Sequence, residues 1–404
     1  MSHWRLCAVL LVGLVLLAQT PARAQSLNEI LAGRLSDNCA GLSGAGILGF
    51  PSPGNNPDYG PQLRSLCGTE NASGTGAASG GGGIISAEDR ISIAIEQRIR
   101  RRTQQRRAAA SADGDRGFGL FFTTEYEQFD KDNTRFETGF DRDTIGGTLG
   151  ADYALNPSLL LGLAVNYAHE FGDYVGGGGF DHDSYGVLVY TSFSPIPHAF
   201  VDLVGGYIRK NYSFERRAAI DIFNIDAQVT KNVAGKTQAD TDGDEFRFSA
   251  YGGYDFVLGS VTVGPRVGVN YRDTTIDGFR ESGNTGIELV YDNQNIVSLT
   301  TNAGVYGSIV GSTGFGVIVP QATVEYVHEF LNDQRSVGFS LVQDLVRRRF
   351  LYRTDSPDRD YVNVAFGISM VFPSGVTAFA NFRELVGYRD RSSHAVSLGV
   401  RFAF

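Results

Sequence analysis

The last thirteen residues of the chain, 392–404, alternate between apolar side chains and small or polar ones. The apolar positions come at every second residue and are Val396, Leu398, Val400, Phe402 and Phe404. A spacing of two places one kind of side chain on each face of a β-strand. A tilted strand crosses a bilayer in roughly 9 to 11 residues, so this segment is long enough to span a membrane with one face in lipid and the other in water.

The same alternation recurs through residues 116–404, with turn residues between the segments. The twelve segments are 118–127, 145–153, 159–171, 184–193, 199–212, 245–258, 261–272, 296–306, 315–330, 361–372, 376–387 and 392–404. Short turns alternate with long polar loops, of which 332–360 is one, and the strand count is even, as in single-chain bacterial barrels. We therefore expect an all-β membrane fold, a twelve-stranded antiparallel transmembrane β-barrel. Residues 336–342 are also strand-like and could form a strand above the membrane.

The N-terminus predicts export. Arg5 supplies a positive charge, residues 6–18 an apolar run, and Ala22-Arg23-Ala24 a cleavage site, so residues 1–24 form a signal peptide for the Sec pathway. The rest of the chain has no run of 18 apolar residues that could span as a helix, and the sequence holds 51 Gly, 27 Phe and 18 Tyr. Such a composition indicates the outer membrane of a Gram-negative bacterium, with the lipid bilayer around the barrel.

Residues 25–83 read as a short N-terminal module that ends in a Gly-rich linker. Cys39 and Cys67 are the two cysteines that remain after removal of the signal peptide. In an oxidising periplasm we expect them to form a disulfide, which would contribute roughly 3 to 4 kcal/mol by closing a loop of about 29 residues.

Residues 84–115 predict a basic helix followed by a turn. Ser86 and Asp89 fit a helix-starting capping box, and Ile91, Ile95 and Ile99 recur at helical spacing. The basic positions are Arg98, Arg100, Arg101, Arg102, Arg106 and Arg107. Nucleic-acid binding is not expected of an exported chain with a net charge of −9, and the remaining alternatives are a solvated surface helix and a helix inside the barrel.

The charges of the barrel favour a helix in the lumen. Alternation points nine acidic side chains inward: Glu125, Glu127, Asp152, Glu170, Asp202, Glu245, Asp255, Glu325 and Glu329. The basic side chains expected on that face are Lys210, Arg247, Arg266, Arg272 and Arg401. Twelve strands leave a lumen about 12 Å wide, which is about the diameter of one α-helix. A basic helix in an acidic lumen is the electrostatically favoured arrangement.

The sequence offers no arrangement of residues for catalysis. It lacks a Gly-x-Ser-x-Gly motif, and alternation puts His169, His328 and His394 on lipid-facing or interface positions. Two acidic runs, 181–183 and 240–245, are assigned to outer loops, where solvated charge is favoured over a divalent cation site. We expect no enzymatic activity, no cofactor and no metal.

Two stretches carry a resemblance to a known family. Residues 324–330, Val-Glu-Tyr-Val-His-Glu-Phe, resemble the penultimate-hairpin motif of the autotransporter β-domain, and residues 398–404, Leu-Gly-Val-Arg-Phe-Ala-Phe, resemble its C-terminal ending. The resemblance to this type V secretion family covers residues 84–404. It implies a helix in the pore, a passenger carried to the cell surface, and an assembly signal of Val400, Phe402 and Phe404 that the outer-membrane barrel assembly machinery reads.

The chain departs from the family in two ways. Only about 60 residues precede the basic helix, and that helix has no Asn pair, so the self-cleavage of some members is not expected. Two function classes remain open. The first is an autotransporter-type barrel, expected to be a monomer, that translocates, displays or anchors residues 25–83. The second is a plugged barrel or narrow porin whose N-terminal segment stays in the periplasm.

Overall fold

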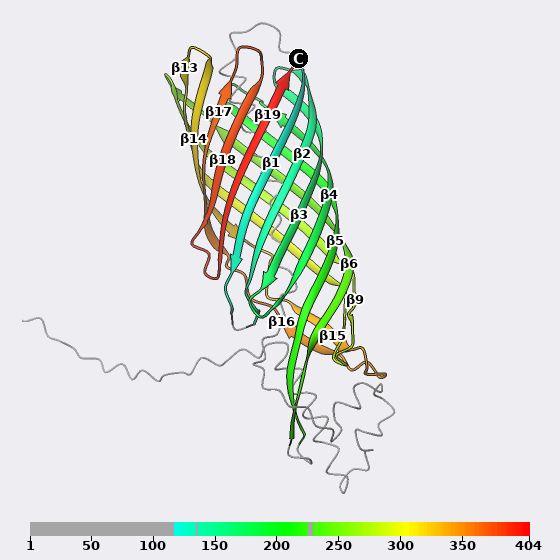
Figure 1. Cartoon of the computed structure of the whole chain (residues 1–404). Coiled ribbons are helices and arrows are strands. Elements are labelled where there is room, and N and C mark those ends of the chain that lie inside the picture. The colour runs from blue at the N-terminus through cyan, green and yellow to red at the C-terminus, as the bar shows by residue number, and fades with distance from the viewer. Residues whose placement is uncertain (1–116, 135, 225–228) are drawn as a thin grey trace, which may run out of the picture.

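Twelve antiparallel strands form a closed barrel in the computed structural model, which describes residues 117–134, 136–224 and 229–404 (Figure 1). The barrel strands are β1 (Phe118–Lys131), β2 (Phe140–Asn156), β3 (Leu159–Tyr174), β4 (Gly178–Phe193), β5 (Ala199–Asn224), β6 (Val229–Tyr254), β8 (Val261–Ile276), β12 (Gln294–Ile309), β14 (Gly316–Glu329), β17 (Asp360–Val371), β18 (Thr377–Val386) and β19 (Arg391–Ala403). The twelve strands predicted from alternation are confirmed. No helix within the described ranges is long and apolar enough to cross a membrane.

The barrel closes between its first and last strands. β1 pairs with β19 from Gly119 opposite Ala403 to Lys131 opposite Arg391. Each of the other barrel strands pairs with the barrel strand that follows it in the sequence, and two short pieces, β7 (Phe256–Leu258) and β13 (Gly311–Thr313), extend the wall at one end. Closure leaves no free edge, so the backbone N–H and C=O groups of every barrel strand can pair with a neighbour. This is the condition for a sheet to cross a bilayer.

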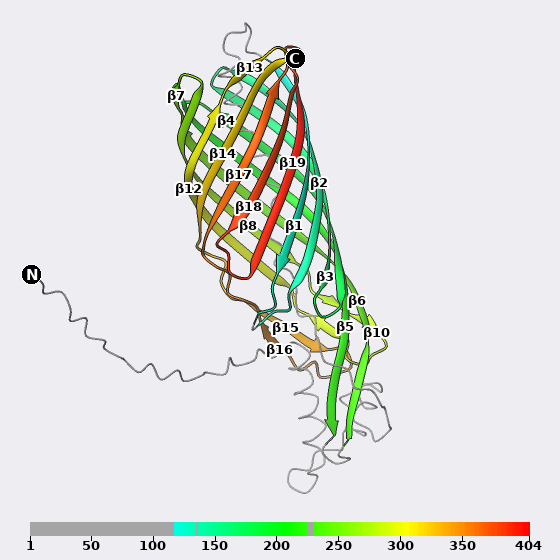
Figure 2. The ribbon, with the colours of Figure 1, turned by 60° about the vertical axis from the view of Figure 1, so that its left-hand side comes forward.

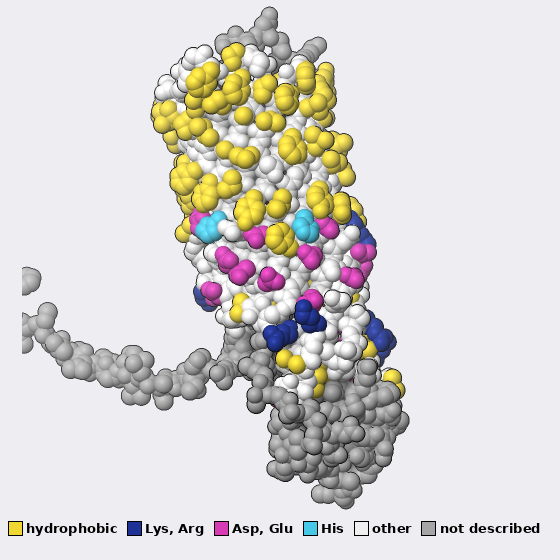
Figure 3. Space-filling view, viewed as in Figure 1, with side chains coloured by type: hydrophobic (Ala, Val, Ile, Leu, Met, Phe, Trp, Pro, Cys, Tyr) yellow, Lys and Arg dark blue, Asp and Glu magenta, His cyan; other side chains and the backbone are white. Residues whose placement is uncertain are grey.

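Outward side chains are apolar along much of the barrel. Leu149, Leu163, Val189 and Val267 are more than half exposed, which is expected of side chains that face lipid. Figure 3 shows these apolar side chains as a broad belt over the end of the barrel that holds the short turns, followed by a band of acidic side chains. Inward positions are buried and mostly polar, so alternation separates a lipid face from a lumen face.

The two ends of the barrel differ. Turns at one end are short, as at residues 157–158 and 259–260, and the C-terminus lies at this end (Figure 1). The other end carries the two longest described connections, 277–293 and 330–359, and β5 and β6 project from it (Figure 2). We call these the short-turn end and the long-loop end.

Several strands are longer at the long-loop end than alternation predicted. β5 and β6 pair without interruption from Ala199 opposite Tyr254 to Asn224 opposite Val229. The acidic runs 181–183 and 240–245 therefore lie on strands β4 and β6, and their assignment to outer loops was wrong. Outside the membrane both faces of a strand can be polar, so backbone pairing continues where the apolar alternation stops.

A second, smaller sheet covers the long-loop end. It consists of β9 (Phe279–Arg280), β11 (Leu289–Tyr291), β15 (Ser336–Leu341) and β16 (Phe350–Arg353), in the order β16-β15-β11-β9, and β10 (Ser282–Gly283) pairs with β6 beside it. The strand-like segment 336–342 contributes β15, but the other strands of this sheet were not predicted. We call the loops 277–293 and 330–359, which carry this sheet, the cap.

A hydrophobic core holds the cap on the barrel. Its members come from the cap and from β5, β6, β8 and β12, and Phe180 of β4 packs against them. They include Phe214, Ile220, Ile276, Ile287, Leu289, Tyr291, Val337 and Phe339. Ile220, Ile276, Ile287 and Leu289 are fully buried. Burial of each large apolar side chain stabilises the fold by about 1.5 to 3 kcal/mol, so this core is enough to hold the two loops against the barrel mouth.

Candidate functional site

The lumen wall is the first candidate, because it gathers buried charges from nearly every strand. The nine acidic positions named from the sequence face inward; Asp202, Glu245 and Asp255 are at most 2% exposed, and Glu125 is partly exposed. A buried carboxylate is costly unless a charge or hydrogen-bond donor satisfies it. The wall therefore has to supply partners for these groups.

Basic side chains of the wall supply many of those partners. The ion pairs are Arg142–Glu170 at 3.2 Å, Lys210–Glu245 at 2.7 Å, Arg401–Asp152 at 3.1 Å, Arg383–Glu125 at 3.5 Å, and the closer pairs Arg266–Asp255 and Arg247–Glu245. With Arg272, seven basic side chains oppose nine acidic ones, which leaves a net charge of −2 among them.

Serine and asparagine side chains satisfy other lumen carboxylates. Ser192 donates to Asp202 at 2.7 Å, and Asn302 donates to Glu325 at 3.2 Å. Ser393 donates to Glu127 at 2.5 Å. The Glu329 carboxylate accepts hydrogen bonds from the Ser298 hydroxyl and from the backbone N–H of Leu299, Leu331 and Asn332. The wall is thus an ordered polar network.

Sequence reasoning missed two of the wall cations. Arg142 lies before the alternating part of β2, and Arg383 lies on β18 between Phe382 and Glu384, so neither was assigned to the lumen. The inward parity of each strand was the signal that could have found them, because Arg142 and Thr144 share a face with Thr148, and Arg383 shares one with Asn381.

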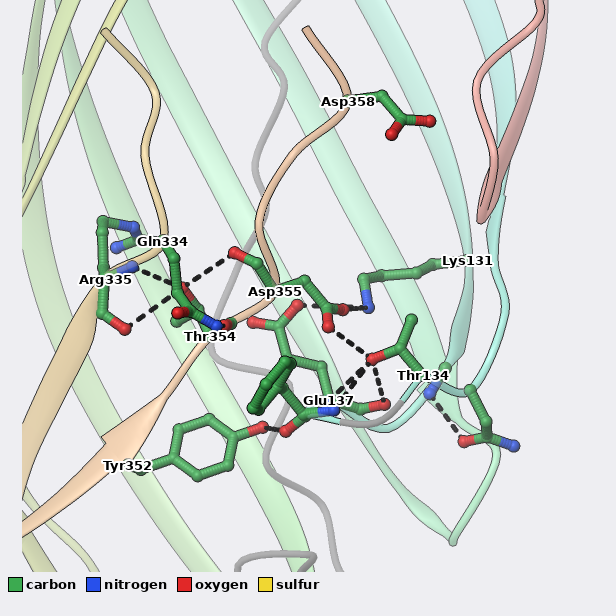
Figure 4. Close-up of polar contacts among 12 residues, drawn as sticks. Lys131, Thr134, Glu137, Gln334, Arg335, Tyr352, Thr354, Asp355 and Asp358 are labelled. Carbon is green, nitrogen blue, oxygen red and sulfur yellow. Dashed lines mark hydrogen bonds and ion pairs between the residues drawn. The ribbon is translucent and has the colours of Figure 1, made fainter. Parts of the chain in front are cut away.

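The mouth of the barrel at the long-loop end is held by a polar latch (Figure 4). Lys131 at the end of β1 pairs with Asp355 at 2.6 Å and with Glu137 at 3.1 Å, and Thr134 donates to Asp355 at 2.5 Å. The Tyr352 hydroxyl donates to the carbonyl of Phe136. We call Lys131, Thr134, Glu137 and Asp355 the latch, because they join the β1–β2 loop to the cap.

The pKa values of the two latch carboxyls shift in opposite directions. Burial raises the pKa of Glu137 above its usual value, against the opposing charge of Lys131. Burial also acts to raise the pKa of Asp355, but hydrogen bonds from Lys131, Thr134 and Glu137 outweigh it, and the pKa is lowered. Glu137 therefore keeps its proton to a higher pH than Asp355 does, and over that range it donates the proton to the ionised Asp355, which also pairs with Lys131.

A second ion pair fixes the cap to β5. The Arg216 guanidinium donates to both carboxylate oxygens of Glu281, at 2.7 and 2.6 Å, and to the carbonyl of Ile287 at 3.1 Å. Glu281 also accepts from the backbone N–H of Leu289 at 2.9 Å. A two-point contact between guanidinium and carboxylate sets orientation as well as distance, so β9 and β11 are held in one position over the mouth.

The outer surface carries a ring of paired side chains where the apolar belt ends. Histidines sit at this boundary in Figure 3. The ring nitrogens and their acids on the neighbouring strand are His169–Asp183 at 3.0 Å, His328–Asp360 at 2.7 Å and His394–Glu384 at 2.5 Å. Tyr167 and Tyr326 donate to the same two aspartates. These residues form the membrane interface, where rings and charges meet the headgroups.

The remaining site residues from the sequence fall into two groups. Val400, Phe402 and Phe404 end the last strand on the lipid side, with Phe402 and Phe404 exposed. Cys39, Cys67 and the arginines of the basic segment, Arg98 to Arg107, lie outside the described residues, as do the boundaries at 24, 83 and 115. Within the described ranges, no group of three or more His, Cys, Asp or Glu side chains is arranged to hold a metal ion.

Curated relatives match only part of their own length. Lipase 1 of Photorhabdus luminescens is 23% identical over 264 residues, which is 64% of this chain and 38% of that protein. Esterase EstA of Pseudomonas aeruginosa is 27% identical over 172 residues, or 41% of this chain and 26% of that protein. The chain spans well under half the length of these relatives.

Solved structures with this fold include two autotransporter barrels. The translocator domain of the autotransporter NalP from Neisseria meningitidis superimposes with a TM-score of 0.55 and 13% identity, over 77% of this chain and 98% of that one. The β-domain of the Bordetella autotransporter BrkA gives 0.50 and 16% identity, over 72% and 100%. The autotransporter β-domain family model matches residues 120–383, from the third residue of β1 into β18. The chain therefore belongs to the autotransporter β-domain family and forms an outer-membrane barrel.

Proposed function

We propose that this barrel carries residues 25–83 to the cell surface through its lumen and anchors them there. The observation that carries the proposal is where β1 begins. The backbone N–H of Phe404 donates to the carbonyl of Phe118 at 2.9 Å, and their rings stack 6.5 Å apart, so β1 starts beside the C-terminus at the short-turn end. In this family's outer-membrane barrels the short turns face the periplasm. A segment before Phe118 that is to reach the outer side must pass along the lumen.

The lumen suits residues 84–115 as its occupant. The segment from 84 to 110 carries seven arginines against three acids, a net charge of +4, and the wall groups described above leave −2. Opposite charges in a partly dry channel attract strongly. Arg98, Arg100, Arg101, Arg102, Arg106 and Arg107 are the side chains that we propose lie against the polar wall.

The module itself is small enough for such a path. A disulfide between Cys39 and Cys67 would keep it compact, and the Gly-rich linker that ends at Gly83 would let it stand clear of the cap. The lipase and the esterase among the relatives are matched over only 38% and 26% of their lengths, so their hydrolytic activities are not assigned to this module. Export through the Sec pathway and insertion by the barrel assembly machinery belong to the same proposal.

The test is the sidedness of an epitope tag placed after Gln25 on intact cells. We expect antibody labelling and protease removal of the tag without permeabilisation. Two matched tags calibrate the assay: one between Leu345 and Val346, which are exposed on the cap, and one in the short turn 373–375. A Gln25 tag that behaves like the turn tag, reachable only after the membrane is opened, would favour a porin with a periplasmic N-terminal segment.

A further inference from the structure

The cap sheet has an open edge. β16 is the outermost strand in the order β16-β15-β11-β9, and among the described residues it pairs with β15 alone, from Phe339 opposite Phe350 to Ser336 opposite Arg353. The other edge of the sheet continues into the barrel, because β9 is followed by β10, which pairs with β6. A strand that is paired on one side only presents backbone N–H and C=O groups to a further strand on its other side.

The pairing pattern identifies the backbone groups on that edge. The N–H of Thr354 donates to the carbonyl of Arg335 at 2.9 Å, so these two residues form a hydrogen-bonded pair at the end of the β15–β16 ladder. Hydrogen-bonded and non-hydrogen-bonded pairs alternate along antiparallel strands, so the backbone groups of Leu351 and Arg353 point away from β15. Each of these two residues therefore offers one donor and one acceptor to an incoming strand.

Both ends of β16 are fixed, so the edge is already extended. Asp344, whose side chain is 2% exposed, accepts from the backbone N–H of Val346 at 3.1 Å and of Arg348 at 3.0 Å, and so holds the turn before the strand. Thr354 follows the strand, and its hydroxyl accepts from the N–H of Arg335 at 2.9 Å. A strand that is ordered before binding loses little conformational entropy when a partner adds to it.

The outward face of the edge is apolar and basic. Leu351 is 57% exposed and Arg353 is exposed beside it, whereas Tyr352 between them belongs to the cap core. Arg353 makes no ion pair within the described part of the chain. In an added strand the side chains opposite Leu351 and Arg353 lie on this same face, where apolar pairs and pairs of opposite charge stabilise the sheet. The partner that fits has an apolar and an acidic side chain two positions apart.

The surroundings of β16 carry the same positive charge. Four arginines and two aspartates lie in and around the strand and its preceding turn: Arg347, Arg348, Arg349, Arg353, Asp292 and Asp344. Their net charge is +2, from four positive and two negative groups, in a chain whose net charge is −9. A strand with carboxylates is attracted here, whereas a second copy of β16 would bring like charges together. The occupant is therefore a different, acidic segment.

We propose that the β16 edge binds an extended segment of a second protein outside the cell, in which an apolar and an acidic side chain are two positions apart. The segment adds to the four-stranded cap sheet beside β16, with its apolar side chain against Leu351 and its carboxylate against Arg353. The long-loop end of such barrels faces away from the periplasm, so the edge is reached from outside. The contacts involve no residue of 25–83, so the inference goes beyond the display function.

The experiment measures peptide binding to the full chain in detergent micelles. The probe is a dye-labelled peptide of about eight residues that alternates valine and glutamate, and its fluorescence anisotropy reports binding. We expect saturable binding that Arg353→Glu weakens about tenfold, because an attractive cross-strand pair becomes repulsive. Arg389→Glu is the matched control and should bind like the wild type, because Arg389 is 78% exposed but lies outside the cap sheet.

Two altered peptides separate strand pairing from simple attraction between charges. A valine–lysine peptide should reverse the preference and bind Arg353→Glu more tightly than the wild type. N-methylation of alternate peptide nitrogens removes the N–H groups that pair with the edge, so binding of the valine–glutamate peptide should be lost although its charge is unchanged.

Hydrogen exchange by mass spectrometry locates the contact. Saturating peptide should slow exchange of residues 350–353 severalfold, with little change in β9 at the other edge. Absence of binding, equal binding of both peptides to the wild type, or binding that survives N-methylation overturns the proposal. Slow exchange of residues 350–353 without peptide also overturns it, because another part of this chain then occupies the edge. Charge-dependent binding that N-methylation abolishes and that protects residues 350–353 supports the proposal.

Discussion

Lys131 on β1 and Asp355 in the cap lie 2.6 Å apart, although 224 positions separate them in the chain, and their side chains are only 1% and 12% exposed. This pair joins the first loop of the barrel to the long loop before β17. Removal of one partner leaves a buried charge, which typically costs about 3 to 5 kcal/mol. We expect Asp355→Asn to loosen the cap, seen as faster hydrogen exchange of residues 350–358 by mass spectrometry.

Asp358 provides the matched control for that prediction. It lies in the same loop and pairs with Arg389 at 2.9 Å, but the Arg389 side chain is 78% exposed. Exposed pairs contribute about 0 to 1 kcal/mol. Asp358→Asn should therefore leave exchange of the cap nearly unchanged, and equal effects of the two substitutions would show that the latch does not hold the mouth.

The latch should also depend on pH in two directions. The pKa of Asp355 is lowered in the folded protein, so its contribution is present above about 3.9, the unfolded value, and is lost as the pH falls through the lowered pKa. The pKa of Glu137 is raised, so its contribution is present in acid and is lost as the pH rises through the raised pKa. Exchange of the cap should be slowest between those two pKa values.

Glu137→Gln separates the two limbs of that profile. Glutamine keeps a hydrogen-bond donor where the protonated carboxyl had one, but it does not ionise. The loss of protection at high pH should disappear in this variant, and the loss at low pH should remain because Asp355 is still present. An unchanged alkaline limb would mean that another group titrates there.

The barrel could be predicted because lipid enforces the pattern. Side chains that face lipid must be apolar. The outward positions along 159–171 of β3 and in β19 therefore alternate with the inward ones, and each strand can be recognised in the sequence. Above the membrane that constraint ends. The outer halves of β5 and β6, and the cap strands such as β11, are built from local pairings and a compact core that leave no period-2 signature.

The lumen residues show the same division. Glu170 was assigned inward from the parity of β3, and the structure places it there, buried at 3%. His182 was assigned to a loop, because Asp181 and Asp183 on either side of it look like solvated charge. On a strand these three alternate: the two aspartates face outward, and His182 is buried beside Glu170 at 3.5 Å. Which partners meet across strands depends on register, which a single sequence does not reveal.

The charge of the basic segment should control the conductance of the barrel. If the arginines from Arg98 to Arg107 lie against the wall, then replacing Arg100, Arg101 and Arg102 by glutamate creates repulsion from the nine acidic and seven basic wall groups described above, whose net charge is −2. We expect planar-bilayer conductance to rise severalfold. Replacement of the same residues by lysine keeps the charge and should leave conductance low; equal conductance in all three proteins would place the segment outside the lumen.

The barrel should assemble without the N-terminal module. Its strands satisfy one another's backbone hydrogen bonds from β1 to β19, and the described contacts of the wall and the latch come from residues after 116. Deletion of residues 25–83 should therefore leave a heat-modifiable band in the outer-membrane fraction at close to the wild-type amount. Loss of the band, with the chain found in the periplasm, would show that the module is needed for insertion.

The two terminal phenylalanines allow burial to be separated from recognition. Phe402 is 43% exposed and Phe404 is 74% exposed, so loss of buried area alone predicts that Phe402→Ala costs more than Phe404→Ala. If the assembly machinery reads the last residue, Phe404→Ala should reduce the amount of heat-modifiable barrel in cells severalfold more than Phe402→Ala.

Refolding of the urea-denatured chains into detergent micelles, where no machinery is present, is the control. There the order should reverse or the difference vanish, because only packing such as the ring stack of Phe404 on Phe118 remains. A larger defect of Phe402→Ala in both settings would mean that burial, and not recognition of Phe404, sets the yield.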